Sequence, residues 1–180
     1  MNLLFETDRL IIKPINQKYK EEIFRYRSDK TTNKYQGWIP ETVEDVVTFI
    51  GKTSNVINKP GTWFQFVIVE IESQKIIGDI GVHFLDKDNK QVEIGFTLDK
   101  DFQNQGYATE SLRCVINYLF KYLNKHRVIA STDPENLKSI KLLERLGFRR
   151  EAHFVESLYL NGKWVDDLIF AMIEKDWEKI

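Results

Sequence analysis

The segment from Val92 to Leu123 constrains the fold most, because it reads as a strand, a short loop and a long helix. Val92–Leu98 is rich in apolar and β-favouring residues, whereas the residues from Asp99 to Gln105 are polar and show no period. From Gly106 onward, apolar residues recur every three or four positions, which predicts an amphipathic helix. These residues are Ala108, Leu112, Val115, Ile116, Leu119, Phe120 and Leu123.

The start of this helix is a candidate site for an anion. The N–H groups of a first helical turn have no intrahelical partner, and the helix dipole adds partial positive charge there. Gly106 lets the backbone approach a ligand closely, and Ala108 adds almost no bulk. A phosphate is stabilised at such a place, although a Gly-x-Ala sequence also serves as a plain entry turn. No G-x-x-x-x-G-K-S/T sequence and no G-x-G-x-x-G after the first strand occur, which argues against an NTPase loop and a dinucleotide fold.

The rest of the chain predicts an α+β fold with one mixed sheet. The expected order is a strand, two helices, three strands joined by short turns, the long helix, a strand, a second crossover helix and two strands. A helix between the fourth and fifth strands makes them parallel neighbours, and Asn161-Gly162 predicts a final hairpin. We therefore expect about seven strands, mostly antiparallel with a parallel pair at the centre, and about four helices. All of this forms a single expected domain, residues 1–180.

Composition narrows the function classes. The chain has 180 residues, 42% of them hydrophobic, and a formal net charge of −1, so it offers no general electrostatic footprint for nucleic acid or an anionic membrane. Its one cysteine, Cys114, excludes an internal disulfide and a cysteine-based zinc site. We see no signal peptide and no apolar run of the ~20 residues that span a bilayer. We predict a cytoplasmic protein without a metal, as a monomer or homodimer.

Four segments together resemble the GNAT N-acetyltransferases, and in particular the Rim-type branch of ribosomal-protein-alanine acetyltransferases. They are E-T-D-R-L-I-I-K-P at 6–14, E-I-G-F-T-L-D at 93–99, Q-N-Q-G-Y-A-T-E-S at 103–111 and N-L-K-S-I-K-L-L-E-R-L-G-F at 136–148. Residues 103–108 fit the pattern Q/R-x-x-G-x-G/A of the pyrophosphate loop in that family. The resemblance covers nearly the whole chain and implies the GNAT fold.

The resemblance also implies acetyl-CoA as the cosubstrate and assigns its site. Its pyrophosphate would lie on the backbone amides of Gln105, Gly106, Tyr107, Ala108 and Thr109, with Gln103 and Asn104 at the loop entry. Its pantetheine arm would pair with the backbone of Phe96, Thr97 and Leu98, where a β-bulge splays the strand. Asn136 would contact the cofactor, with Ser139 one helical turn on, although Asn136 also suits a helix N-cap. Relatives often carry a smaller residue where this chain has Asn104.

The expected reaction is direct attack of a neutral amine on the thioester in a ternary complex, which needs a base, an oxyanion donor and protonation of the leaving thiolate. Glu93 resembles the acidic residue that Rim-type relatives use and is the candidate base, although it also suits an exposed strand glutamate or an ion pair. The backbone N–H of Leu98 is the expected oxyanion donor. Many relatives use a tyrosine as acid where this chain has Leu143, so Ser139 is the candidate here, although Ser139 also suits helix capping or a cofactor contact. Asp166 is a weaker second base, and His83, His126 and His153 are expected to be packing or surface residues. The expected acceptor cleft is lined by Tyr35, Trp38, Glu93 and Tyr159, whose aromatic members could instead cover the core.

Three functions stay open from the sequence. An α-amine with a pKa near 8 costs only about 1.4 kcal/mol to deprotonate at pH 7, whereas a lysine costs about 4.6 kcal/mol. A single carboxylate therefore suffices for a protein N-terminal α-amine, which is the expected acceptor. A polyamine or an aminoglycoside is the alternative acceptor. The third interpretation, motivated by Leu143, is a catalytically silent CoA-binding module.

Overall fold

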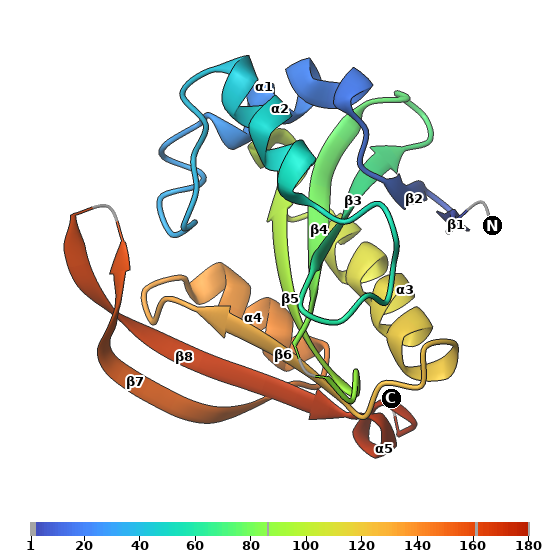
Figure 1. Ribbon diagram of the computed structural model, residues 1–180, viewed down its shortest axis with the longest axis vertical. Helices are drawn as coiled ribbons and strands as arrows, with labels where there is room; N and C mark the ends of the chain where they lie inside the picture. Colours follow the sequence, from blue (N-terminus) through green and yellow to red (C-terminus); the bar gives the residue numbers. More distant parts are fainter. Residues whose placement is uncertain (1–2, 86, 161, 180) are drawn as a thin grey trace.

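Eight strands form one sheet in the computed structural model, which describes residues 3–85, 87–160 and 162–179. Their order across the sheet is β1-β2-β3-β4-β5-β6-β8-β7 (Figure 1). The strands are β1 Phe5–Glu6, β2 Leu10–Pro14, β3 Trp63–Glu70, β4 Ile76–Phe84, β5 Gln91–Leu98, β6 Arg127–Thr132, β7 Arg149–Leu160 and β8 Lys163–Ile173. The expected count of about seven was one too low, because the two residues of β1 are too few to show a period in the sequence.

Four substantial helices are present, as predicted. They are α1 Lys20–Arg27, α2 Val43–Lys52, α3 Tyr107–Lys121 and α4 Leu137–Arg145, with a single further turn at α5 Glu174–Trp177. Short 3-10 helices, η1 Gln17–Tyr19 and η2 Lys100–Phe102, precede α1 and follow β5. Helix α2 begins at a capping box, in which Thr42 Oγ1 accepts from Asp45 N while the Asp45 carboxylate accepts from Thr42 N.

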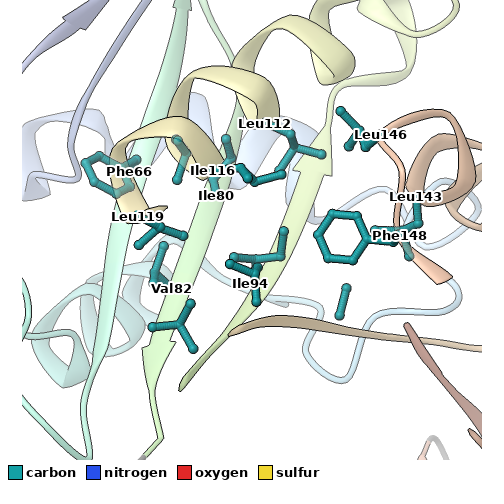
Figure 2. Close-up of a cluster of buried hydrophobic side chains, with 14 of the residues drawn as sticks. Phe66, Ile80, Val82, Ile94, Leu112, Ile116, Leu119, Leu143, Leu146 and Phe148 are labelled. Carbon is teal, nitrogen blue, oxygen red and sulfur yellow. The ribbon is translucent and has the colours of Figure 1, made fainter. Parts of the chain in front are cut away.

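The two faces of the sheet bury different helices, because side chains alternate along each strand. In β3, Phe64, Phe66 and Ile68 join the larger core with α3 and α4, whereas Val67 and Val69 join a smaller core with α1 and α2. Figure 2 shows the larger core, where residues of α3 and of the α4 segment meet over β4 and β5. Helix α3 is thereby held with its first turn at the end of β5 (Figure 1).

The parallel pair at the centre of the sheet is confirmed, and it is short. Residues Gln91–Glu93 of β5 pair with residues Arg127–Ile129 of β6. The pairing stops there, although β5 continues to Leu98 and β6 to Thr132. The family resemblance implied a β-bulge in β5. The pairing of β5 with β4 shows no bulge, because β5 keeps one register with β4 from Val92 to Leu98. Strand β6 instead stays paired with β8 along its whole length and turns away from β5. Beyond Glu93 and Ile129 the facing edges of β5 and β6 are therefore unpaired, and we call this unpaired stretch the opening.

The chain ends in the predicted hairpin of β7 and β8, which projects beyond the rest of the sheet (Figure 1). Leu160 pairs with Lys163, so the connection has two residues. Gly162 has φ +84°, as expected for such a turn, while Asn161 lies outside the described residues. In the part of the chain that the structure describes, no helix combines the length and apolarity needed to cross a membrane.

Candidate active site

The loop before α3 has the backbone that its sequence requires. Gly106 is left-handed, with φ +87°, and α3 begins at the next residue. Asn104, where relatives often carry a smaller residue, has φ +62°. Asparagine is among the few residues that tolerate this conformation. The departure at Asn104 is therefore compatible with the loop geometry.

Side chains of this loop are bound to the protein. Gln103 Nε2 donates to Leu98 O at 3.1 Å, and Gln103 Oε1 accepts from Lys138 Nζ on α4 at 2.9 Å. Gln105 Nε2 donates to Asp101 O at 3.0 Å, and Tyr107 Oη donates to Glu70 Oε1 at 3.2 Å. The first bond within α3 runs from Glu110 N to Gly106 O. The N–H groups of Tyr107, Ala108 and Thr109, which precede that bond, therefore have no acceptor within the helix and are suited to a ligand.

The edge of β5 toward the opening also offers backbone donors. Asp99 N donates to Ile77 O on the β4 side at 2.7 Å, so by alternation the backbone groups of Phe96 and Leu98 point away from β4. Their carbonyls accept from Gln36 Nε2 at 3.3 Å and Gln103 Nε2 at 3.1 Å. Because β6 has already diverged, the N–H groups of Phe96 and Leu98 face the opening. An extended ligand could add to this edge as a further strand.

Helix α4 begins on the other side of the opening. Asn136 Oδ1 accepts from Ser139 N at 3.2 Å, so the N-cap role of Asn136 is confirmed. Ser139 is half-buried, and Leu143 one turn on is 1% exposed in the larger core. Tyr35 Oη donates to Glu135 O at 3.1 Å, which brings the segment between α1 and α2 to the start of α4.

Glu93 lies on the sheet face opposite α3, at the point where β5 and β6 separate. The β4–β5 register pairs it with His83, whose Nδ1 lies 3.7 Å from Glu93 Oε2. The His83 ring in turn stacks on Trp63, with centroids 4.7 Å apart. Burial raises the pKa of the Glu93 carboxyl; the charge of His83 opposes this rise and that of Asp167 adds to it. A carboxylate with a raised pKa beside an opening is suited to accept a proton.

The two neighbouring aspartates of β8 have different environments. Asp166 binds His153 Nε2 at 2.6 Å and Glu156 N at 2.9 Å, on the projecting hairpin. Asp167 is 7% exposed and accepts a hydrogen bond from Ser131 Oγ at 2.5 Å. Its charge raises the pKa of Glu93. Asp166 was the predicted second base, whereas Asp167 was not predicted. Adjacent residues of a strand face opposite sides of the sheet. Counting back from the apolar run at the end of β8 could therefore have shown that Asp166 and Asp167 lie on different faces.

Open space lies over Gly95, between Glu93 and Thr97. A Cβ built on Gly95 would meet no atom within 4 Å. Gly81 is the partner of Gly95 on β4, and a Cβ built there would meet Gln65 Oε1 at 2.7 Å and the Trp63 ring at 3.1 Å. These two side chains therefore cover Gly81 but not Gly95. Thr97 is 5% exposed, and its Oγ1 is, among the described residues, the one buried side-chain polar atom without a hydrogen-bond partner. This space adjoins the opening between β5 and β6.

No ring contact among the described residues joins Tyr35, Trp38 and Tyr159, although the segments that carry them approach each other, since a Cβ on Gly37 would lie 3.7 Å from Leu160 Cδ2. Trp38 stacks on Phe49 at 4.4 Å and lies 5.3 Å from the Arg27 guanidinium, which pairs with buried Asp79 at 2.5 Å. This packing is the core-covering alternative for Trp38. Tyr159 is 61% exposed and meets Trp164 edge-on at the end of the hairpin.

The sequence and the fold match a known protein family. Residues 9–149 match the family described as Acetyltransferase (GNAT) domain. The chain belongs to the GNAT acetyltransferase family. The uncharacterized N-acetyltransferase YnaD of Bacillus subtilis (strain 168) is 32% identical over 174 residues, which cover 95% of this chain and 97% of that protein. The crystal structure of an acetyltransferase (GNAT family) from Bacillus anthracis is 28% identical, with TM-score 0.86, and covers 96% of this chain and 99% of its own.

A further relative agrees with the Rim-type resemblance of this GNAT protein. The ribosomal protein uS5-alanine N-acetyltransferase of Escherichia coli (strain K12) is 25% identical over 177 residues, covering 95% of this chain and 91% of that protein. The predictions of the family, the fold and the enzyme class are thereby confirmed. GNAT enzymes use acetyl-CoA as the cosubstrate and acetylate an amine.

Sequence reasoning missed three neighbours of the candidate site: Trp63, Asp167 and Arg9. Trp63 and Asp167 come into the site through strand register, which no local motif reveals. Arg9 lies in the E-T-D-R-L segment that contributed to the family resemblance, and its place beside the loop follows from the long-range contacts of α3.

Proposed function

We propose that this GNAT protein moves the acetyl group of acetyl-CoA to a primary amine by direct attack in a ternary complex. The observation that carries the proposal is the opening beyond the Glu93–Ile129 pair. On one side of it lie the donors at the start of α3 and on the β5 edge, and on the other lies Glu93 with its raised pKa. The reaction needs the donor and the acceptor to meet at one place, and this arrangement of donors and carboxylate supports such a place.

The donor would use the backbone of the loop and of β5. Its diphosphate would take the N–H groups from Gln105 to Thr109, with Gln103 and Asn104 shaping the entry. Its pantetheine arm would add to β5 along Phe96, Thr97 and Leu98. The Asn136 side chain would contribute its Nδ2, because its Oδ1 is taken by Ser139 N. The N–H groups of the first α3 turn and those of the β5 edge that β6 leaves unpaired support this placement.

The transfer then needs only groups already in place. The amine nitrogen attacks the thioester carbon, its proton passes to Glu93 directly or through water, and the carbonyl oxygen accepts from Leu98 N–H. The C–S bond breaks as the C–N bond is completed, and the released thiolate takes up a proton. Ser139 is the candidate donor of that proton, since Leu143 is buried and has no polar atom.

A protein N-terminal α-amine is the acceptor that this arrangement favours. An α-amine with a pKa near 8 is easily deprotonated at neutral pH, so a single carboxylate such as Glu93 is a sufficient base for it. Glu93 and Asp167 together favour a positively charged acceptor, which keeps a polyamine such as spermidine as the second candidate. The aromatic residues Tyr35, Trp38 and Tyr159 stay predictions as acceptor contacts.

The test is turnover of acetyl-CoA with an acceptor panel, followed as free thiol. The panel contains peptides with free and with blocked N-termini, spermidine and an aminoglycoside. We expect thiol release with the free peptides and none with the blocked ones. Release with spermidine alone would select the polyamine function. Calorimetric binding of CoA without thiol release from any acceptor would overturn the proposal in favour of a silent binding module.

We predict that Ser139→Ala lowers kcat by less than about tenfold, because a thiol with a pKa near 8.5 can also be protonated by water at neutral pH. Ser157→Ala on the exposed hairpin, where Ser157 Oγ donates to Phe154 O, is the control and should leave kcat unchanged. Steady-state kinetics with the best acceptor give the comparison. A loss beyond about 100-fold would instead make Ser139 the required acid.

A further inference from the structure

Arg9 holds the loop at the start of α3 from outside the loop. Its Nη1 donates to Gln105 O at 3.0 Å, while its Nε and Nη2 donate to Glu110 Oε2 at 2.8 and 2.6 Å. Its guanidinium lies over the Tyr107 ring, 4.4 Å from the centroid. One side chain thus contacts the loop, the first residue of α3 and the acid of the first turn.

The contact with Gln105 fixes the direction of a backbone donor. In a trans peptide the C=O and the following N–H point in opposite directions. Because Gln105 O points at Arg9, the N–H of Gly106 must point away from Arg9, on the side that the proposed diphosphate would occupy. Glycine adopts most backbone conformations freely, so Gly106 alone would not hold this peptide in one orientation. Arg9 supplies that restriction.

The contact with Glu110 removes an unfavourable charge. A carboxylate in the first turn of α3 would repel a bound diphosphate. Although burial raises the pKa of Glu110, the hydrogen bonds from Thr7 and Arg9 outweigh it and lower that pKa, so Glu110 is ionised at neutral pH. Thr7 Oγ1 donates to Glu110 Oε1 at 2.6 Å, and Arg9 neutralises the charge at Oε2.

We propose that Arg9 is the positioning residue of the phosphate loop, which orients the Gln105–Gly106 peptide and neutralises Glu110 without touching the diphosphate. The inference rests on the proposed binding of CoA at this loop. Only arginine fits the role, because its planar fork bonds two acceptors while its face stacks on Tyr107. A lysine ammonium has neither the fork nor the face.

The first test is calorimetry with CoA. We expect Arg9→Ala to raise Kd by about 10- to 100-fold, the range of hydrogen bonds that involve a charged group, and Arg9→Lys to restore little of it. Adding Glu110→Gln to Arg9→Ala should recover the part that is due to charge. Arg149→Ala is the matched control, since Arg149 is likewise a half-exposed arginine in ion pairs, here with Glu151 and Asp176, but lies far along the chain from the loop. An unchanged Kd in Arg9→Ala would overturn the inference.

The second test separates positioning from damage to the fold. Acetyl-pantetheine carries the thioester but no diphosphate, so its kcat/KM should be the same in Arg9→Ala and in the wild type. The kcat/KM for acetyl-CoA should fall by the factor seen in Kd. Equal losses with both donors would show a general structural defect and overturn the inference. A wild type that does not bind CoA would instead refute the proposed function, so the two failures are distinct.

Discussion

Replacing Gly106 with glutamate is expected to abolish acetyl-CoA binding, with Kd raised by more than about 100-fold. The new side chain would begin on the Arg9 side of the loop, and its carboxylate would add a negative charge beside the proposed diphosphate site at the start of α3. Two like charges about 4 Å apart repel by about 4 kcal/mol near a protein surface. The side chain would also start 3.3 Å from Arg9 Nη2 and compete with Gln105 and Glu110 for the guanidinium. Titration calorimetry with acetyl-CoA measures the loss.

Two further variants separate charge from backbone strain. Gly106→Ala carries the cost of a left-handed non-glycine residue, about 1–2 kcal/mol, and the same 3.3 Å contact with Arg9 Nη2 but no charge, so it should weaken binding much less than Gly106→Glu. Gly61→Glu adds the same charge at φ +73°, in open space and outside the loop. It should lower the melting temperature slightly and leave Kd as in the wild type. Full affinity in Gly106→Glu would place the diphosphate elsewhere.

The loop could be predicted from sequence because its physics is local. A positive φ at Gly106, a helix start at Tyr107 and an N-cap at Asn136 each depend on residues within one turn. The left-handed Asn104 follows the same logic, since the short amide side chain tolerates that conformation. Local rules therefore fixed where an anion could bind.

The acceptor side could not be predicted, because it depends on register and twist. His83 comes beside Glu93 only because β4 and β5 pair in one register, and Trp63 joins them through β3. The charge of Asp167 raises the pKa of Glu93 although β6 lies between β5 and β8 in the sheet, so this influence too depends on the arrangement of the strands. The divergence of β5 from β6 arises from the twist of a whole sheet, so the expected bulge was the wrong cause for a correct opening.

Replacing Glu93 with glutamine should lower kcat by about 100-fold or more, the usual contribution of a general base, while the Kd of CoA stays within about twofold. Glutamine keeps the shape of the side chain and cannot take the proton of the amine. Glu93 faces away from the α3 core and the loop, so the donor site is untouched. Asp166→Asn is the control, because Asp166 bonds His153 and Glu156 on the hairpin. A larger loss in Asp166→Asn than in Glu93→Gln would transfer the role of base to Asp166.

The pH profile tests the same role in the wild type. Only the carboxylate form of Glu93 accepts a proton, so kcat/KM should fall as the pH drops through the Glu93 pKa. Because burial raises that pKa, the fall should begin at a higher pH than for an exposed glutamate, whose pKa is about 4.3. Glu93→Gln has no carboxyl to titrate at this position. Its kcat/KM should therefore lose this fall at low pH and depend on pH only through deprotonation of the acceptor amine. If the variant retains the fall with the same midpoint, another group takes the proton.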